Sequence, residues 1–397
     1  MKKIFILAIA LAAFVANSVQ AATPDELYDY AWKLISKKYV DPTNNYQDWN
    51  KWRYKYKNKL QTFDDCYVAI DTMLASLNDP YTRFLDEKEF NEETTSIRGS
   101  LKGIGTQIGI RDGQLVIIAP IENSPAELAG LKADDYILEI DGKSTKGITI
   151  EKAADRIRGE KGTTVSLLIK RGNAEPKLFV IVRDEIEIKS VSTKMPIETP
   201  MPEDIQYVRL SSFLSQNASN EIQTILRNCG DKKGIILDLR SNPGGLLVNA
   251  ITISDMFLKG GVIVSTVDRD RYKDTTRATF TNITDKPLVI LINKGSASAS
   301  EILSGALKDN HRAVIVGEQS YGKGLVQEIN KLPNGTGMNV TIQRYLTPNG
   351  TDINKKGITP DVTIELTEEQ ALAKDDVQLK RAIKIMQEMT CLSQKNG

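Results

Sequence analysis

The second half of the chain alternates short apolar runs with amphipathic segments, and this alternation limits the possible folds more than any other feature. Apolar runs bounded by turn residues, as expected of buried strands, are found at 234–239, 287–292 and 313–316. Segments with helical periodicity are found at 219–228, 247–258 and 299–309. This strand–helix–strand order predicts an α/β domain.

Two regions with different residue patterns, one helical and one rich in predicted strands, precede that domain. A capping box with proline at the first helical position, Thr23-Pro24-Asp25-Glu26, begins a helix to about residue 38, and a second amphipathic helix follows. Between 97 and 185 the chain has glycine turns and two short helices, 125–131 and 150–157, among predicted strands at 115–119, 136–140, 165–170 and 177–182. With 397 residues, several domains are expected: a helical region 22–96, a β-rich module 97–185, an α/β core 186–368 and a helical tail 369–397.

The first 21 residues have the pattern of an export signal. A basic start is followed by an apolar run, 4–15, and by the small-residue pattern Val19-Gln20-Ala21. The run is too short for a comfortable membrane span, so we expect cleavage after Ala21 and an exported chain, periplasmic or extracellular; an uncleaved anchor is the alternative. No later stretch approaches about 20 uninterrupted apolar residues, so no stable span is expected after cleavage.

Composition argues against several partners. The 52 lysines and arginines balance 51 acidic residues, which offers no electrostatic reason to expect nucleic acid or an anionic membrane. The aromatic and lysine-rich stretch 49–56 is therefore interpreted as a solvated connection with packed aromatic rings rather than an RNA-binding segment. The three cysteines, Cys66, Cys229 and Cys391, are widely spaced and predict small buried side chains, not a disulfide framework or a zinc site.

The histidine content restricts the chemistry. His311 is the only histidine, and it follows the end of a predicted helix, where a lone histidine is more often a terminal or surface residue than a base. A hydrolase of this sequence must build a triad around that residue or use another base, and lysine is the known substitute.

Ser298 is the candidate nucleophile. It opens a helix after an apolar strand, where free N–H groups and the helix dipole would stabilise an oxyanion. The same Ser298-x-x-Glu301 spacing is also that of a capping box without catalytic meaning. The glycine-rich loop 238–245 could complete an oxyanion hole or could simply be a tight turn.

Lys323 is the candidate base. It lies in the segment 317–324, which has the glycines and the lysine of a P-loop at the right spacing. Gly324 stands where a P-loop requires Ser or Thr, and the following residues resemble a strand. Nucleotide binding is therefore disfavoured. Lowering a lysine pKa from ~10.4 toward neutrality requires about 4 kcal/mol, which burial away from carboxylates could supply. Gln327 could orient the amine without adding charge.

Taken in order, these segments resemble the C-terminal processing peptidases (tail-specific proteases), serine peptidase family S41. Motifs in the family's order are found at 79–85, 103–105, 238–245, 296–301, 317–327, 347–350 and 357–362, over nearly the whole mature chain. The resemblance implies a dyad of Ser298 and Lys323, 25 residues apart, with Gln327 as the third catalytic position. It further implies an oxyanion hole made by the N–H groups of Gly244 and Ala299, and a structural role for Asp309.

The resemblance also implies the architecture and the activity. The expected fold is α/β, of the crotonase/ClpP-like kind, with an inserted or preceding PDZ domain at 97–185 and an N-terminal helical segment. Gly103, Ile104 and Gly105 match the PDZ carboxylate-binding loop, where a substrate tail adds as an extra strand. The expected activity is endoproteolysis near the C-termini of exported or unfolded proteins, with no metal or cofactor. Separately, the helices before residue 97 and the tail helix near 376–389 could serve a homo-oligomer. A silent PDZ adaptor and a P-loop nucleotide binder are the alternatives.

Overall fold

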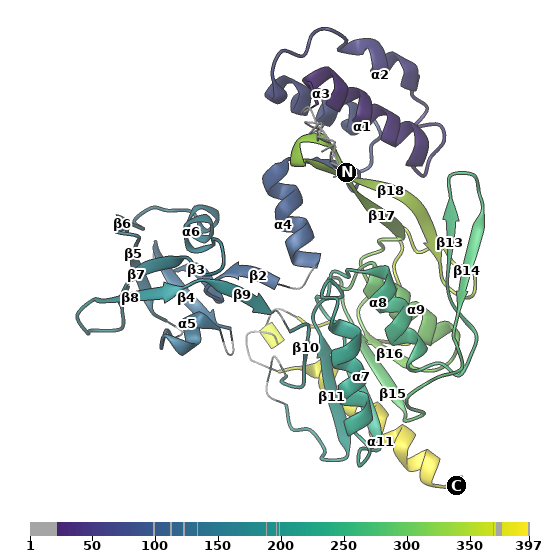
Figure 1. Ribbon diagram of the computed structural model, residues 1–397. Helices are drawn as coiled ribbons and strands as arrows, with labels where there is room; N and C mark the ends of the chain where they lie inside the picture. Colours follow the sequence, from purple (N-terminus) through teal and green to yellow (C-terminus); the bar gives the residue numbers. More distant parts are fainter. Residues whose placement is uncertain are drawn as a thin grey trace, which may run out of the picture. The chain divides into compact units, whose positions relative to one another are not determined.

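The computed structural model describes residues 22–97, 100–111, 113–121, 124–132, 134–187, 189–195, 197, 199–367, 369–370 and 375–395. The predicted export signal lies outside them. The chain divides into two compact units, one formed by the residues up to Phe90 with Ile329–Val340, and the other by Asn91–Glu328 with Thr341 onward. Figure 1 shows the elements of both.

Three helices build the first unit: α1 (Pro24–Lys38), α2 (Trp49–Lys55) and α3 (Phe63–Ala75). The predicted capping box of Thr23 and Glu26 begins α1. The stretch 49–56 connects α1 to α3 with packed aromatic rings, as interpreted, and most of it forms the helix α2, in which Trp49 is buried. The Trp32 indole N–H donates to the Trp49 carbonyl at 2.8 Å, which fixes α2 on its neighbour.

The remaining elements of this unit are short. Strand β1 (Arg83–Leu85) pairs antiparallel with the first residues of β18 (Gly337–Leu346). A 3-10 turn, η1 (Pro333–Gly335), separates β18 from the end of β17 (Leu325–Lys331). Helix α4 (Glu87–Ile97) starts in this unit and ends in the second one.

A β-rich domain with its own apolar core forms the first part of the second unit. Its main sheet has the order β3 (Thr106–Arg111), β4 (Gln114–Pro120), β5 (Tyr136–Ile140), β7 (Thr164–Lys170) and β8 (Lys177–Val182), with β6 (Lys143–Ser144) on β5. A separate ladder joins β2 (Ser100–Gly103) to β9 (Asp184–Glu187), and the helices are α5 (Pro125–Leu128) and α6 (Ile150–Ile157). The predicted strands and α6 are confirmed; α5 ends three residues earlier than predicted.

The α/β part contains a six-stranded sheet. Its order is β10 (Val191–Ser192), β11 (Ile205–Leu210), β12 (Gly234–Asp238), β15 (Leu288–Ile292), β16 (Val314–Gly317) and β19 (Val362–Thr363). All neighbours are parallel except β10 and β11. The α/β prediction is therefore confirmed.

Helices cover both faces of this sheet. One apolar core joins the sheet to α7 (Ala218–Asn228), α8 (Leu247–Asp255) and α9 (Ala299–Asp309). Alternate strand residues, such as Ile236 and Leu291, belong to a second core with α11 (Val377–Lys395), and successive side chains of a strand point to opposite faces. The tail helix therefore packs on its own sheet, a contact that the sequence did not predict.

Two further observations concern strands and cysteines. Strand β13 (Val262–Asp268), which was not predicted, pairs with β14 (Lys273–Arg277) and with the last residues of β18. Cys66 and Cys229 are buried and unpaired as predicted, whereas Cys391 is exposed, so the prediction of a buried side chain is wrong there.

No described helix is long and apolar enough to cross a membrane.

The order of the parallel strands positions the candidate site. Strand β15 lies between β12 and β16. Because parallel strands place their carboxyl ends at one edge of the sheet, the loops after these three strands converge there. They are the loops 239–246, 293–298 and 318–324, which contain the three predicted catalytic segments.

Candidate active site

Ser298 occupies the N-cap of α9 in an unusual backbone conformation. Its φ of 54° and ψ of −113° are rare for a residue with a side chain, and such strain concentrates at functional sites. Its carbonyl accepts the N–H groups of Glu301 at 2.8 Å and Ile302 at 2.9 Å, so the helix starts at this residue. The spacing of Ser298 and Glu301 is that of a capping box, in which the Glu301 carboxylate accepts the Ser298 N–H. The half-buried side chain of Ser298 therefore lies at the mouth of the helix.

Glu301 joins the serine loop to the lysine loop. This carboxylate is fully buried, and one of its oxygens, Oε2, accepts the N–H of Ser298 at 2.8 Å and the N–H of Lys323 at 2.9 Å. The other oxygen, Oε1, accepts the Ser320 hydroxyl at 2.6 Å and the Gly322 N–H at 2.7 Å. A single carboxylate thus receives four hydrogen bonds and holds the two predicted catalytic residues by their backbones.

Tyr345 completes the surroundings of this carboxylate. Its hydroxyl donates to the Ser298 carbonyl at 3.1 Å. Burial, together with the negative charge of Glu301, raises the pKa of Tyr345 well above its ordinary value. The phenol therefore stays protonated and able to donate.

The lysine loop lies close to other backbone. A methyl group on Gly322 or Gly324 would come within 2.8 or 2.7 Å of backbone nitrogen atoms in 354–356, and Gly322 has a φ of +89°. The following element is strand β17 and not a helix, as the sequence predicted. This geometry agrees with the argument against a P-loop, because a P-loop opens a helix.

The loop after β12 lies against the serine. A methyl group on Gly244 would come within 2.8 Å of Ser298 Cβ and 2.9 Å of the Ala299 nitrogen, so only glycine leaves space there. The Gly244 N–H donates to Asn242 Oδ1 at 2.9 Å. Gly244 and Ala299 therefore lie side by side at the serine, but the N–H group of Gly244 is engaged by its own loop.

A buried ionic network fixes the start of that loop. The Arg240 guanidinium donates to Asp238 at 2.7 Å and to Asp376, which precedes α11, at 2.8 Å. The Tyr207 hydroxyl donates to Asp238 at 2.8 Å. Burial opposes the charge of Arg240, but its hydrogen bonds to both carboxylates outweigh that cost and raise its pKa above the ordinary value. The tail of the chain thus contributes to the order of the 239–246 loop.

Three other residues that the sequence analysis singled out have hydrogen bonds or positions outside the contacts described above. Gln327, on β17, directs its amide nitrogen to the hydroxyl of Thr341 at 3.4 Å. Asp309 accepts the N–H of Asn349 at 3.0 Å, a contact that fastens a turn to the end of α9. His311 is exposed after α9 with a φ of 54°, as expected of a helix-terminal residue.

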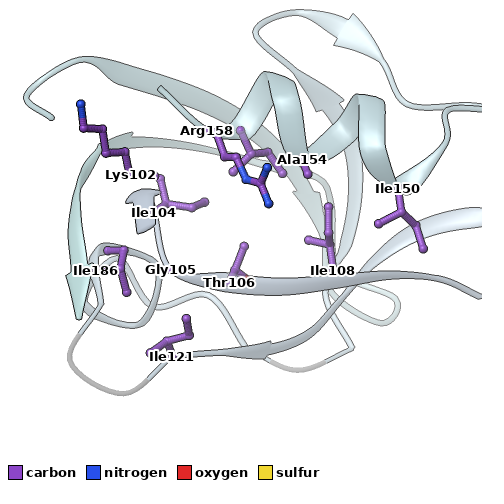
Figure 2. Close-up of a pocket in the computed structure, with 12 residues that line it drawn as sticks. Lys102, Ile104, Gly105, Thr106, Ile108, Ile121, Ile150, Ala154, Arg158 and Ile186 are labelled. Atoms are coloured by element: carbon purple, nitrogen blue, oxygen red, sulfur yellow. The ribbon is translucent and has the colours of Figure 1, made fainter. Parts of the chain in front are cut away.

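A pocket of about 220 Å³ lies in the β-rich domain between β3 and α6. Figure 2 shows its apolar lining, with Ile108 and Ile150 at one end and Ile186 and Ile104 nearer the other. Gly103, Ile104 and Gly105, the predicted carboxylate-binding loop, line it, and the basic side chains of Lys102 and Arg158 stand beside them. Gly105 has a φ of +73°, and β3 begins at the next residue, Thr106.

The sequence signalled some of these residues only partly. The spacing Ser298-x-x-Glu301 indicated that Glu301 could cap the start of the helix. Its hydrogen bonds with Ser320 and Gly322 come from a loop about 20 residues away, and the spacing did not indicate them. Asp376 contacts Arg240 across 136 positions, and no local pattern marks such a partner. Within the described residues no cluster of three or more His, Cys, Asp or Glu side chains could hold a metal ion.

Comparisons with known proteins agree with this architecture. Residues 204–364 match Peptidase family S41, and residues 116–171 match the PDZ domain. A carboxyl-terminal-processing protease of Synechocystis sp. is 40% identical over 92% of this chain and 88% of its own length. The corresponding protein of Picosynechococcus sp. is 44% identical over 84% of this chain and 81% of its own length. The solved photosystem II D1 C-terminal processing protease is 33% identical, with a TM-score of 0.59, over 87% of this chain and 94% of that one.

A parallel α/β sheet of this type, with a PDZ domain before it, defines a class of peptidases, hydrolases that act on peptide bonds. The sequence identity with the two cyanobacterial relatives, over more than four fifths of their length, narrows this class to one family. The chain belongs to the carboxyl-terminal-processing proteases of peptidase family S41.

Proposed function

We propose that the chain is an exported serine endopeptidase that cleaves near the C-termini of exported or unfolded proteins, with Ser298 as nucleophile and Lys323 as general base. The observation that supports this most is the shared oxygen of Glu301, which accepts the backbone N–H groups of both residues. Segments that carry a serine and a lysine are thereby held at one point, at the N-terminus of a helix.

In the proposed reaction the neutral Lys323 amine takes the proton of the Ser298 hydroxyl while the serine oxygen attacks the peptide carbonyl carbon. The carbonyl oxygen becomes an oxyanion that the Ala299 N–H stabilises at the first position of α9. Gly244 serves as the second donor once its N–H exchanges the Asn242 side chain for substrate. The leaving amine takes the proton from the lysine ammonium, and water then cleaves the acyl-enzyme by the same route. Gln327 has the role of orienting the lysine.

The PDZ pocket is proposed to capture the substrate tail. A strand added beside β3 would direct its terminal carboxylate toward the loop 103–105 and the neighbouring basic side chains of Lys102 and Arg158. The isoleucines of the pocket would accept apolar tail residues. A fluorescent peptide with a free apolar C-terminus should therefore bind at least tenfold more tightly than its C-terminal amide. Equal binding of the two peptides would contradict tail capture.

Cleavage of an unfolded protein with an apolar tail tests the dyad. Ser298→Ala and Lys323→Ala should each abolish the products seen by mass spectrometry, and Lys294→Ala, which removes an exposed lysine of the serine loop, should leave them unchanged. Retained cleavage by Ser298→Ala would refute the nucleophile. A wild-type chain that binds tails but never cleaves them would favour the silent adaptor.

Export is tested separately by the N-terminal sequence of the protein recovered from outside the cytoplasm. Cleavage after Ala21 predicts Ala22 as the first residue. An N-terminus at Met1 would instead support the retained anchor.

A further inference from the structure

The stretch of residues 51–59 is the most basic part of the first unit. No acidic residue lies between Asp48 and Asp64, whereas every second position from 51 to 59 is basic: Lys51, Arg53, Lys55, Lys57 and Lys59. The balance of charge over the whole chain conceals this local excess, because net charge averages over all 397 residues. The peptidase chemistry proposed above uses none of these side chains.

Two of these five cations contact carboxylates. Arg53 pairs with Asp29 at 3.0 Å and stacks 4.6 Å from the centre of the Trp32 ring, and Lys51 faces Asp48 at 3.8 Å. Lys55, Lys57 and Lys59 are exposed, and in the described part of the chain no carboxylate lies within ion-pair distance of them. Three positive charges on this surface are therefore uncompensated.

Aromatic rings lie beneath two of these lysines. The ammonium group of Lys55 is 3.9 Å from the centre of the Trp52 ring, and that of Lys57 is 5.9 Å from the centre of the Tyr54 ring. Tyr54 is itself 60% exposed. Ammonium groups over Trp and Tyr rings form cation–π contacts, and surface Trp and Tyr rings beside lysines are also typical of the boundary between lipid and water.

The stretch is fixed to the first helix. The Asn58 N–H donates at 3.3 Å to Asp25, in the first turn of α1. The inference rests on the export proposed above, because export takes this surface to a compartment that has membranes and little nucleic acid.

We propose that Lys55, Lys57 and Lys59, with Trp52 and Tyr54, form a peripheral docking surface for a membrane that contains anionic phospholipid. The surface adds no membrane span. It holds the chain at the lipid headgroups by charge and by the amphipathic rings. The contribution of each lysine near such a membrane corresponds to about fivefold in binding and weakens as salt is added.

Sedimentation of the purified full chain with vesicles tests the proposal. Vesicles of phosphatidylcholine with phosphatidylglycerol should bind the chain far more strongly than vesicles of phosphatidylcholine alone, which report any insertion of the apolar segment. The variant Lys55→Gln/Lys57→Gln/Lys59→Gln should lose on the order of 100-fold of the binding to anionic vesicles. Tyr54→Ala should lose less, and the cleavage of a soluble peptide should be unchanged in both variants.

A matched variant controls for overall charge. Lys132→Gln/Lys143→Gln/Lys146→Gln removes three exposed lysines from the PDZ domain and should retain the binding; Tyr272→Ala is the control for the exposed tyrosine. Equal losses in the two triple variants, or equal binding of wild type to both kinds of vesicle, would overturn the proposal. So would displacement of the chain from anionic vesicles by stoichiometric single-stranded RNA, which would identify a nucleic-acid surface. Unchanged thermal unfolding would show that the variants are folded.

Discussion

Replacement of Glu301 by glutamine is the sharpest test of how the site is held together. The carboxylate accepts four hydrogen bonds in a fully buried position. An amide retains a single acceptor oxygen. If that oxygen takes the place of Oε2, the bonds to the N–H groups of Ser298 and Lys323 survive, but the new NH₂ group faces the N–H of Gly322.

The magnitude follows from the donor that is left without a partner. A buried N–H group that loses its acceptor costs about 1–3 kcal/mol, and the surviving bonds lose their charge assistance. We expect Glu301→Gln to lower the free energy of unfolding by about 3 kcal/mol. A displacement of about 1 Å between catalytic groups can reduce turnover by roughly 100-fold, so kcat should fall by that order.

Urea unfolding measures the first quantity, and steady-state cleavage of a peptide with an apolar tail measures the second. The control variant Glu175→Gln removes an exposed carboxylate and should change neither. KM should stay within about twofold of the wild-type value if tail binding is separate from Glu301. A Glu301→Gln variant with wild-type kcat and wild-type stability would refute the reasoning, because the two loops would then not depend on the carboxylate.

Other predictions test neighbouring parts of the structure. Gly244→Ala forces a side chain into a φ of +99° and against Ser298, so kcat should fall at least tenfold while tail binding in a fluorescence titration stays unchanged; full activity would contradict the close approach. Asp376→Asn leaves Arg240 with a single carboxylate and should lower the urea unfolding free energy by about 3 kcal/mol, against a change near zero for exposed Asp231→Asn. Burial raises the pKa of Cys66 to about 12. In the folded chain this thiol is therefore protonated and unreactive between about pH 8.5, where an unfolded cysteine ionises, and about pH 12. At pH 8 a thiol reagent should therefore titrate one thiol per native chain, Cys391, and three after unfolding; a native reaction that persists in Cys391→Ser would contradict the burial.

Local patterns in the sequence were sufficient for most elements and for the candidate residues. The runs 234–239, 287–292 and 313–316 predicted β12, β15 and β16, because buried parallel strands must be apolar on both faces. The order of motifs also pointed to Ser298 and Lys323. Whether those residues act as proposed remains a prediction, as do the domain boundaries and the oligomeric state.

The sequence was least informative where a distant partner decides the structure. The stretch 49–56 was interpreted as a connection with packed aromatic rings, and only the contact of Trp32 with Trp49 shows how it is fixed on α1. The tail helix carries an apolar side that could have met another chain, but it covers the second face of its own sheet. In both cases the deciding contact is made by residues far away in the sequence.

By itself, the sequence determined the class of fold and the types of side chain available for chemistry, because periodicity and turn residues act over a few positions. Only the tertiary structure decided that Glu301 joins the serine and lysine loops and that Asp376 holds Arg240. Such partners are selected by the register of parallel strands and by the need to pair buried charges, and these constraints exist only once the chain has folded.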